Sequence, residues 1–285
     1  RSHRGHGAGE HNHPRGSAMT TTPTGTTPTG SGVHRPGIPL DRLVRVELRK
    51  LVDTRAGFWL IASIGIISLA VMIGILAGNR NNPENLNFGE FFGLMNIPTA
   101  IILPVMAILL VTGEWSQRTA LTTFAMEPRR ERVVLAKLAA AFIAAVGAVA
   151  LSLVLGAVGN VIAGVVYSDP AGAWSMPVAG IVNSFVIQIF NLLLGFAFAA
   201  LILNTPGAIV GYFALPTALS IVNELLPSFR DSVGEWIDSS LTQVPFQSGD
   251  WVGAGEWLRL IVSGIVWIGI PLTLGIMRIL RTEIK

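Results

Sequence analysis

Six long runs of apolar residues, separated by shorter polar stretches, occupy most of the chain after residue 57. They cover residues 58–77, 91–112, 138–166, 178–203, 207–226 and 258–280. Because the hydrocarbon core of a bilayer is about 30 Å thick, a helix needs about 20 apolar residues to cross it. Prolines fall inside three of the runs, and membrane helices tolerate them because neighbouring helices satisfy the freed carbonyls. The pattern predicts an all-α integral membrane protein with six transmembrane helices.

Lysine and arginine are concentrated in every second connection between these runs. The basic positions are Arg42, Arg45, Arg49, Lys50 and Arg55 before the first run, Arg118, Arg129, Arg130, Arg132 and Lys137 between the second and third, and Arg278, Arg281 and Lys285 after the last. The alternate connections hold few basic residues and several acidic ones, such as Asp231, Glu235 and Asp238. Cytoplasmic connections carry an excess of Lys and Arg, so the alternation predicts that both termini are cytoplasmic.

The composition agrees with a membrane protein and excludes several kinds of chemistry. Only 13% of the 285 residues are charged, about half the share found in soluble domains. The net charge of +3 comes from basic clusters beside apolar runs, which is typical of topology determinants, so no nucleic-acid partner is expected. The chain has no cysteine and no Gly-x-x-x-x-Gly-Lys-Ser/Thr loop, so it lacks thiolate metal sites and a P-loop. The apolar runs contain no histidine, which argues against an intramembrane enzyme.

Residues 1–39 have a different composition from the rest of the chain. They are rich in Gly, Thr, Pro and His and show no apolar period, which predicts a disordered leader or tail. Two readings of its histidines stay open: metal chelation, or membership of an appended leader that precedes a natural start at Met19. The histidines are His3, His6, His11 and His13.

Residues 40–57 are predicted to form an amphipathic helix at the membrane interface. Leu40, Val44, Leu48 and Leu51 share one face at helical spacing, and the arginines of this segment lie off that face. Such a helix lies in the plane of the membrane with its apolar stripe in the acyl boundary. The helix serves either as an anchor alone or as part of a coupling device.

The connection between the second and third runs is too long and too polar for a simple turn. Its sequence, GEWSQRTALTTFAMEPRRERVVLAK, covers residues 113–137. Leu121, Phe124 and Ala125 recur at helical spacing, and Pro128 then stops the helix. We therefore expect a short helix on the membrane face, followed by a basic hinge that leads into the third run. A simple topology anchor would explain the arginines but not the length or the apolar face.

Small and polar residues also form stripes inside two of the apolar runs. In the third run small side chains recur every four residues, which lets another helix approach closely, and the helix-packing positions include Ala144, Ala148, Ser152 and Gly156. In the fourth run Ser184, Gln188 and Asn191 share one face. Polar groups avoid lipid, so this face lines a translocation path or makes hydrogen bonds between helices.

The connection after the fifth run is long and contains several aromatic residues. The residues that would share one helical face are Phe229, Val233, Trp236, Ile237 and Leu241. Aromatic side chains are enriched at membrane interfaces. The segment is therefore predicted to form an outer interfacial helix.

The connection at residues 113–137 resembles the first cytoplasmic loop of ABC-2 type transporter permeases. In that family Gly-Glu closes the second span, a Thr begins a short coupling helix, and Pro followed by Arg leads to a Lys that opens the third span. The matching positions are Gly113, Glu114, Arg118, Thr119, Pro128, Arg129 or Arg130, Arg132, Ala136 and Lys137. Two departures are Arg118 where the family has Gly, and a second arginine after Pro128. The segment before the first run also resembles the family's N-terminal amphipathic helix, so the resemblance covers residues 41–285.

The resemblance implies a fold like that of the type V exporters and a function as the permease subunit of an ATP-driven transporter, with export expected. The expected partners are an ABC-type ATPase subunit, which binds ATP and Mg, and a second permease chain, identical or different, in a bacterial plasma membrane. The residues expected to couple to the ATPase are Glu114, Arg118, Thr119, Leu121, Phe124, Met126, Pro128, Arg129, Arg130, Arg132 and Lys137. The alternative is a non-transporting scaffold or sensor that docks the same kind of ATPase.

Overall fold

The computed structural model describes residues 38–117, 129–167 and 173–281. These ranges are helical, apart from short connections and one isolated bridge between Asn87 and Ala173. Within them six helices are long and apolar enough to cross a membrane. These are α2 (Arg55–Gly78), α3 (Phe88–Ser116), α5 (Arg130–Tyr167), α6 (Val178–Ile202), α7 (Thr205–Leu225) and the continuous segment Ala254–Arg281. The prediction of an all-helical protein with six such helices is therefore confirmed.

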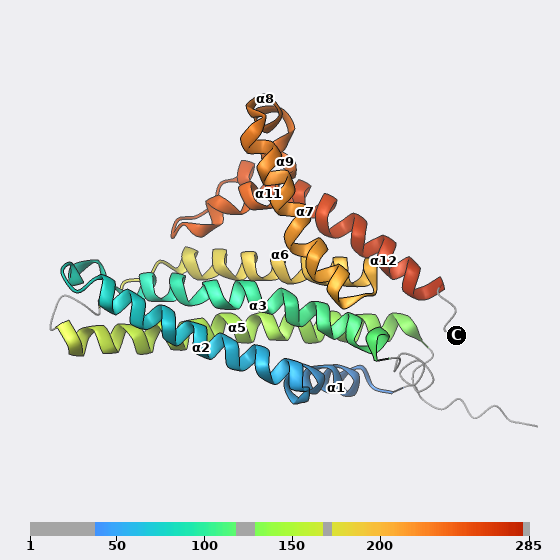
Figure 1. The fold of residues 1–285 in the computed structure, drawn as a ribbon, viewed down its shortest axis with the longest axis horizontal. Helices are drawn as coiled ribbons and strands as arrows, with labels where there is room; N and C mark the ends of the chain where they lie inside the picture. The colour runs from blue at the N-terminus through green and yellow to red at the C-terminus, as the bar shows by residue number, and fades with distance from the viewer. Residues whose placement is uncertain (1–37, 118–128, 168–172, 282–285) are drawn as a thin grey trace, which may run out of the picture. The chain divides into compact units, whose positions relative to one another are not determined.

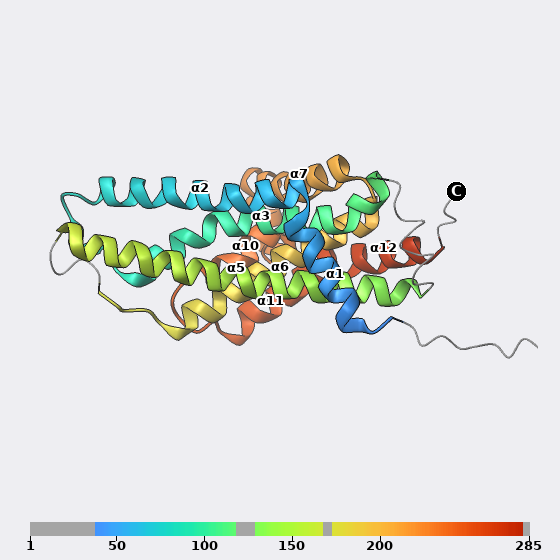
Figure 2. The same cartoon turned by 90° about the horizontal axis from the view of Figure 1, so that it is seen from below.

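Three of these helices form the centre of the bundle. Helix α3 packs mainly against α5 and α6, and Figures 1 and 2 show the three running side by side. Their buried side chains form most of one large apolar cluster, with Ile108 and Phe196 almost fully enclosed. Large apolar side chains such as Ile66 and Val154 are exposed on the outer faces of α2 and α5. Exposed apolar faces of this kind are expected of helices that contact lipid.

The amphipathic segment forms α1 (Leu40–Asp53), and the chain turns at Thr54 before α2 begins. Thr54 has an extended backbone, and its hydroxyl accepts a hydrogen bond of 3.0 Å from the Gly57 amide, which caps the start of α2. Helix α1 packs mainly on α5, with Leu51 buried and with Val44 and Leu48 against the core. This part of the apolar stripe faces protein, and the position of the helix at the membrane interface stays a prediction.

Helix α5 begins at Arg130, so the residues expected to form a basic hinge are helical instead. The segment Arg-Glu-Arg-Val-Val-Leu-Ala-Lys contains neither Gly nor Pro after Pro128, and most of its residues favour helix. Glu131 lies in the first turn, where a negative charge is favourable. The helix therefore extends well beyond the apolar run into the polar connection.

Glycines mark the points at which helices approach most closely. A Cβ at Gly156 of α5 would lie 3.0 Å from the backbone of Phe92 in α3, and one at Gly195 of α6 would lie 2.8 Å from the Pro104 carbonyl oxygen. Of the small residues predicted to pack, Ala148, Ser152 and Gly156 are buried and Ala144 is half-buried. The Ser152 hydroxyl donates to the carbonyl of Met95 in α3 at 3.2 Å.

The last segment is divided into α11 (Ala254–Gly264), the π-helical turn η4 (Ile265–Gly269) and α12 (Ile270–Arg281). Helix α12 packs against α6, and the Arg278 guanidinium donates to the Leu201 carbonyl near the end of α6. Leu203 ends α6 in a left-handed conformation, with φ of 55°. The side chain of Asn204 then caps α7 by accepting from the Gly207 amide at 2.9 Å.

The connection between α7 and α11 is a series of short helical pieces. They are α8 (Pro227–Phe229), the π-helical turn η2 (Arg230–Gly234), α9 (Glu235–Ile237), α10 (Ser239–Gln243) and the 3₁₀ turn η3 (Val244–Gln247). The predicted single helix is interrupted at Asp238, which is fully buried and extended. Its carboxylate accepts from the amides of Ser240 and Leu241 and, at 2.7 Å, from the side chain of Asn223 in α7. These bonds stabilise a new helix start at the point of interruption.

The replacement Gly275→Ala should destabilise the protein. The new Cβ would lie 2.6 Å from the carbonyl carbon of Ala200, so the backbones of α12 and α6 would have to move apart. Overpacking of this kind costs about 1–3 kcal/mol and should lower the midpoint of thermal unfolding in detergent. The matched control is Gly147→Ala, whose Cβ meets no atom within 4 Å. Equal midpoints for the two variants would contradict the close contact.

Candidate functional site

The two helices that flank the polar connection are joined by an ion pair. Glu114 lies in the last turn of α3, and Lys137 lies in the first turns of α5. The ammonium of Lys137 is 3.1 Å from Glu114 Oε1 and donates to the carbonyl of Leu110 at 2.9 Å. The two ends of the connection are therefore held together inside the protein.

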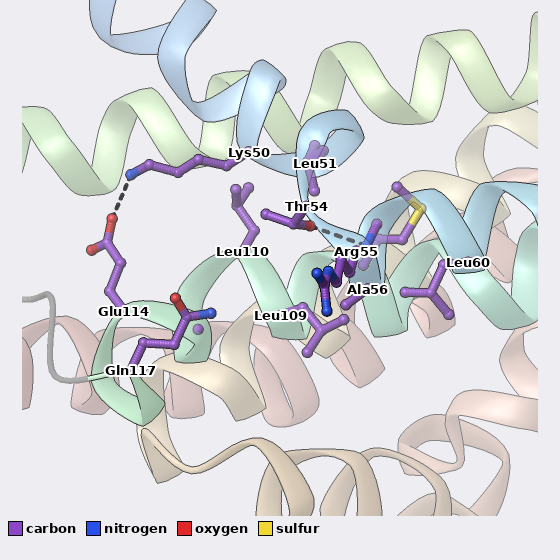
Figure 3. Close-up of a pocket in the computed structure, with 13 residues that line it drawn as sticks. Lys50, Leu51, Thr54, Arg55, Ala56, Leu60, Leu109, Leu110, Glu114 and Gln117 are labelled. Carbon is purple, nitrogen blue, oxygen red and sulfur yellow. Dashed lines mark hydrogen bonds and ion pairs between the residues drawn. The ribbon is translucent and has the colours of Figure 1, made fainter.

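Helix α1 contributes two further charges to the same place. The Lys50 ammonium lies 2.6 Å from Glu47 Oε1 and 2.6 Å from Glu114 Oε1, and Figure 3 shows the second of these contacts. Glu47 Oε2 in turn accepts from the Lys137 ammonium at 2.8 Å. Each lysine therefore contacts both carboxylates, and we call these four side chains the charge network.

The charge network is largely removed from solvent. Glu47, Glu114 and Lys137 are only 4%, 8% and 5% exposed. An unpaired buried charge costs several kcal/mol, but each of these three buried groups has a partner of opposite charge among the described residues. All three donors of the Lys137 ammonium have acceptors, from Glu47, Glu114 and Leu110. The network is thus a satisfied polar centre that joins α1, α3 and α5.

Lys50 is the most accessible member, with about a third of its side chain exposed. Burial by itself would lower the pKa of Lys50, but the carboxylates of Glu47 and Glu114 outweigh it and raise that pKa above the ordinary lysine value. Lys50 is therefore protonated at neutral pH. Because the folded-state pKa is raised, its contribution to stability is complete at neutral pH and is lost only as the pH rises through that folded-state value.

The other residues expected to couple to a partner lie in different surroundings. Arg130 donates to the carbonyl of Ile279 at 2.7 Å, near the end of α12. Arg129 is exposed and Arg132 is half-buried. The remaining expected residues lie outside the described ranges: Arg118, Thr119, Leu121, Phe124, Met126 and Pro128.

The polar stripe of α6 takes part in hydrogen bonds between helices. Gln188 is buried, and its side-chain amide donates to the hydroxyl of Thr99 in α3 at 2.8 Å. The side chain of Asn191 donates to the Gln243 side-chain oxygen in α10 at 2.9 Å, and Ser184 is half-buried. These contacts give two of the three polar groups a partner within the protein. A role in a translocation path stays a prediction.

Sequence reasoning missed Glu47 and treated Lys50 only as a determinant of topology. The signal for Glu47 was present, because it lies on the same helical face as Val44, Leu48 and Leu51. A carboxylate in the middle of an apolar face needs a buried partner. The partner, Lys137, follows 90 residues later, and only the folded chain brings the two together.

Within the described part of the chain, no group of three or more His, Asp or Glu side chains is placed to hold a metal ion. Comparison with models of known protein families finds no match. Comparison with curated proteins finds no match either.

Removing one carboxylate from the charge network should unbalance it. In Glu47→Gln the Lys137 ammonium keeps one carboxylate instead of two, so we expect a loss of stability on the order of 3 kcal/mol, measured by unfolding in detergent. The control is Asp41→Asn on the same helix, which breaks an exposed pair with Arg45 and should cost less than about 1 kcal/mol.

A double variant separates lost charge balance from lost packing. Glu47→Met combined with Lys137→Met leaves the Lys50–Glu114 pair balanced and roughly preserves volume. It should be more stable than either single methionine variant, because each single change leaves a buried charge without its counterpart and the double change does not. Additive losses in the double variant would show that the four groups do not act as a network.

Proposed function

We propose that the protein is the membrane-spanning permease subunit of an ATP-driven transporter of the ABC-2 type, and that it acts as an exporter. The support is the resemblance of residues 113–137 to the coupling loop of that family, combined with six helices long enough to cross a membrane. In this proposal a separate subunit hydrolyses ATP. The polar connection transmits the movement of that subunit to the helices.

The observation that carries the proposal is the position of the charge network. It joins the helix before the connection, the helix after it, and α1. A force applied to the connection would therefore act on α1, α3 and α5 together. A buried network of paired charges does not deform gradually, because separating any pair exposes an uncompensated charge. Such a junction suits the transmission of a movement between subunits as a rigid-body displacement.

The proposal gives the residues of the connection two different roles. Glu114 and Lys137 are internal supports, because both are buried and paired within the chain. Contact with the ATPase falls to the segment between them. Leu121, Phe124 and Met126 would form the apolar plug, and Arg118, Arg129 and Arg132 would supply polar pairing at its edge.

The working unit would contain two permease chains and two ATPase chains. A pair of ATPase domains driving one two-fold path needs two permease subunits, which are either identical or different. This stoichiometry is accessible to mass measurement of the purified complex in detergent. Full transport by a complex with a single permease chain would contradict it.

The proposed orientation is tested by cysteine labelling in intact cells. The chain has no cysteine, so Ser116→Cys and Ser248→Cys each introduce a single thiol at an exposed position. We expect an impermeant maleimide to label Ser248→Cys from outside, and to label Ser116→Cys only after the membrane is opened. Labelling of Ser116→Cys in sealed cells would reverse the orientation and remove the basis for coupling at residues 113–137.

The proposed docking is tested by Phe124→Asp. The change removes an aromatic anchor and puts a charge into a desolvated contact, which should weaken binding of the ATPase roughly a hundredfold or more. The measurement is co-purification, with a tagged chain, of a subunit that carries a P-loop. The matched control is Phe229→Asp, between α7 and α11, which should keep the partner.

Two outcomes of this experiment decide between the candidate functions. If Phe124→Asp keeps its ATPase and its coupled ATP turnover, residues 113–137 are only a topology anchor. If the partner is lost in Phe124→Asp, ATP-dependent flux in vesicles containing the wild-type complex separates a transporter from a scaffold or sensor.

A further inference from the structure

A pocket of about 780 Å³ opens between α1, α2 and α3, next to the charge network. Its apolar wall consists of Leu51, Leu60, Met106, Leu109 and Leu110. Its polar wall consists of Lys50, Thr54, Arg55, Glu114 and Gln117. Figure 3 shows Lys50 and Glu114 at one side of the pocket and Leu60 at the other. The volume lies in the range of small-molecule sites, and the lining suits a ligand with one polar and one apolar part.

The polar wall offers positive charge and free donors. Arg55 has no carboxylate within ion-pair distance among the residues that the structure describes, and its side chain is exposed. Lys50 and Glu114 compensate each other, so Arg55 leaves the wall with a net positive charge. The Lys50 ammonium donates to two carboxylates, and an ammonium has three donors. The pocket can therefore offer a guanidinium and one ammonium N–H to an anion.

The pocket lies where a membrane lipid would meet the protein. Arg55 is the first residue of α2, and one turn later Phe58 and Trp59 are 60% and 66% exposed, with their rings edge to face at 5.8 Å. A basic residue followed by exposed aromatic rings at the end of a membrane helix is typical of the headgroup region. Apart from Leu51 of α1, the apolar wall is formed by α2 and α3, which are both long enough to cross the membrane.

We propose that this pocket binds one anionic phospholipid. The Arg55 guanidinium holds the phosphodiester, which it can contact with two parallel N–H donors, and the free N–H of Lys50 adds a third. Thr54 and Gln117 lie within reach of the headgroup or glycerol oxygens, and an acyl chain lies over Leu60, Met106 and Leu109. A soluble phosphate ester would use the polar wall alone and leave the apolar wall in contact with water. The apolar wall therefore favours a lipid as the occupant.

The proposal needs only that the chain lies in a membrane and does not rest on transport or on an ATPase. On the proposed orientation, the pocket faces the cytoplasmic leaflet, where anionic lipids give a negative surface potential. The bound phosphate would lie beside Lys50, a member of the charge network. Lipid in this leaflet would thereby stabilise the junction of α1 with α2 and α3.

The test measures lipid binding to the purified protein in detergent. Phosphatidylglycerol and phosphatidylcholine with identical acyl chains are added, and bound lipid is counted by native mass spectrometry while the unfolding midpoint is followed. The wild-type protein should bind one phosphatidylglycerol more tightly than phosphatidylcholine and unfold at a higher temperature with it, because a ligand that binds only the folded state stabilises it. Inorganic phosphate should not reproduce this shift.

Two variants locate the site. Arg55→Gln should bind phosphatidylglycerol roughly tenfold more weakly or worse, since a hydrogen-bonded ion pair is lost. Its matched control, Arg49→Gln, removes the same charge from α1 outside the pocket lining and should bind as the wild type does. Leu109→Trp should reduce lipid binding without any change of charge, because the larger side chain would fill the part of the pocket beside the apolar wall.

Each alternative outcome overturns the proposal. Equal losses in Arg55→Gln and Arg49→Gln would indicate diffuse attraction to a basic surface. Equal affinity for the two lipids would remove the preference for an anion, and stabilisation by inorganic phosphate alone would indicate a soluble anion instead. Unchanged lipid binding in Leu109→Trp would place the acyl chain elsewhere. If Arg55→Gln does not fold, Leu109→Trp still decides the matter, because it leaves the polar wall intact.

Discussion

The pairing of four charged side chains at the junction of α1, α3 and α5 is the constraint on which the described part of this junction depends. Glu47, Glu114 and Lys137 are buried, and no one of them could be accommodated there alone. Because each lysine contacts both carboxylates, moving one helix away from the other two would break two ion pairs at once. The helices on either side of the polar connection are therefore fixed to each other and to α1.

Much of the helical architecture could be predicted from the sequence because the bilayer imposes it. A continuous apolar run of about 20 residues has few alternatives to a membrane helix, since every backbone group must be satisfied within the segment. The same reasoning could not locate the helix ends, because helices continue beyond the hydrocarbon. Helix α5 shows this, beginning at Arg130 although the apolar run begins at residue 138. Those first turns place Lys137 next to Glu47.

The parts that could not be predicted depend on contacts between distant residues. Glu47 gave a local signal, a carboxylate on an apolar helix face, but not the identity of its partner. The interruption of the helix at Asp238 could not be predicted either, because the helical spacing of apolar residues from Phe229 to Leu241 continues across it. A buried hydrogen bond from Asn223 and two backbone amides stabilise the interruption. Periodicity describes one element at a time, whereas these features are set by its neighbours.

The sharing of Lys50 between the charge network and the pocket has a consequence for how the junction responds to its surroundings. The two carboxylates of the network are compensated by Lys50 and Lys137, so a phosphate near Lys50 would compete with Glu47 and Glu114 for its donors. Arg55 changes this balance, because it brings a positive charge that the network does not use. A phosphate held mainly by Arg55 needs only the third donor of Lys50 and leaves both ion pairs intact. If the pocket binds lipid as proposed, the anion would strengthen the junction while Arg55 is present and would disturb it when Arg55 is removed.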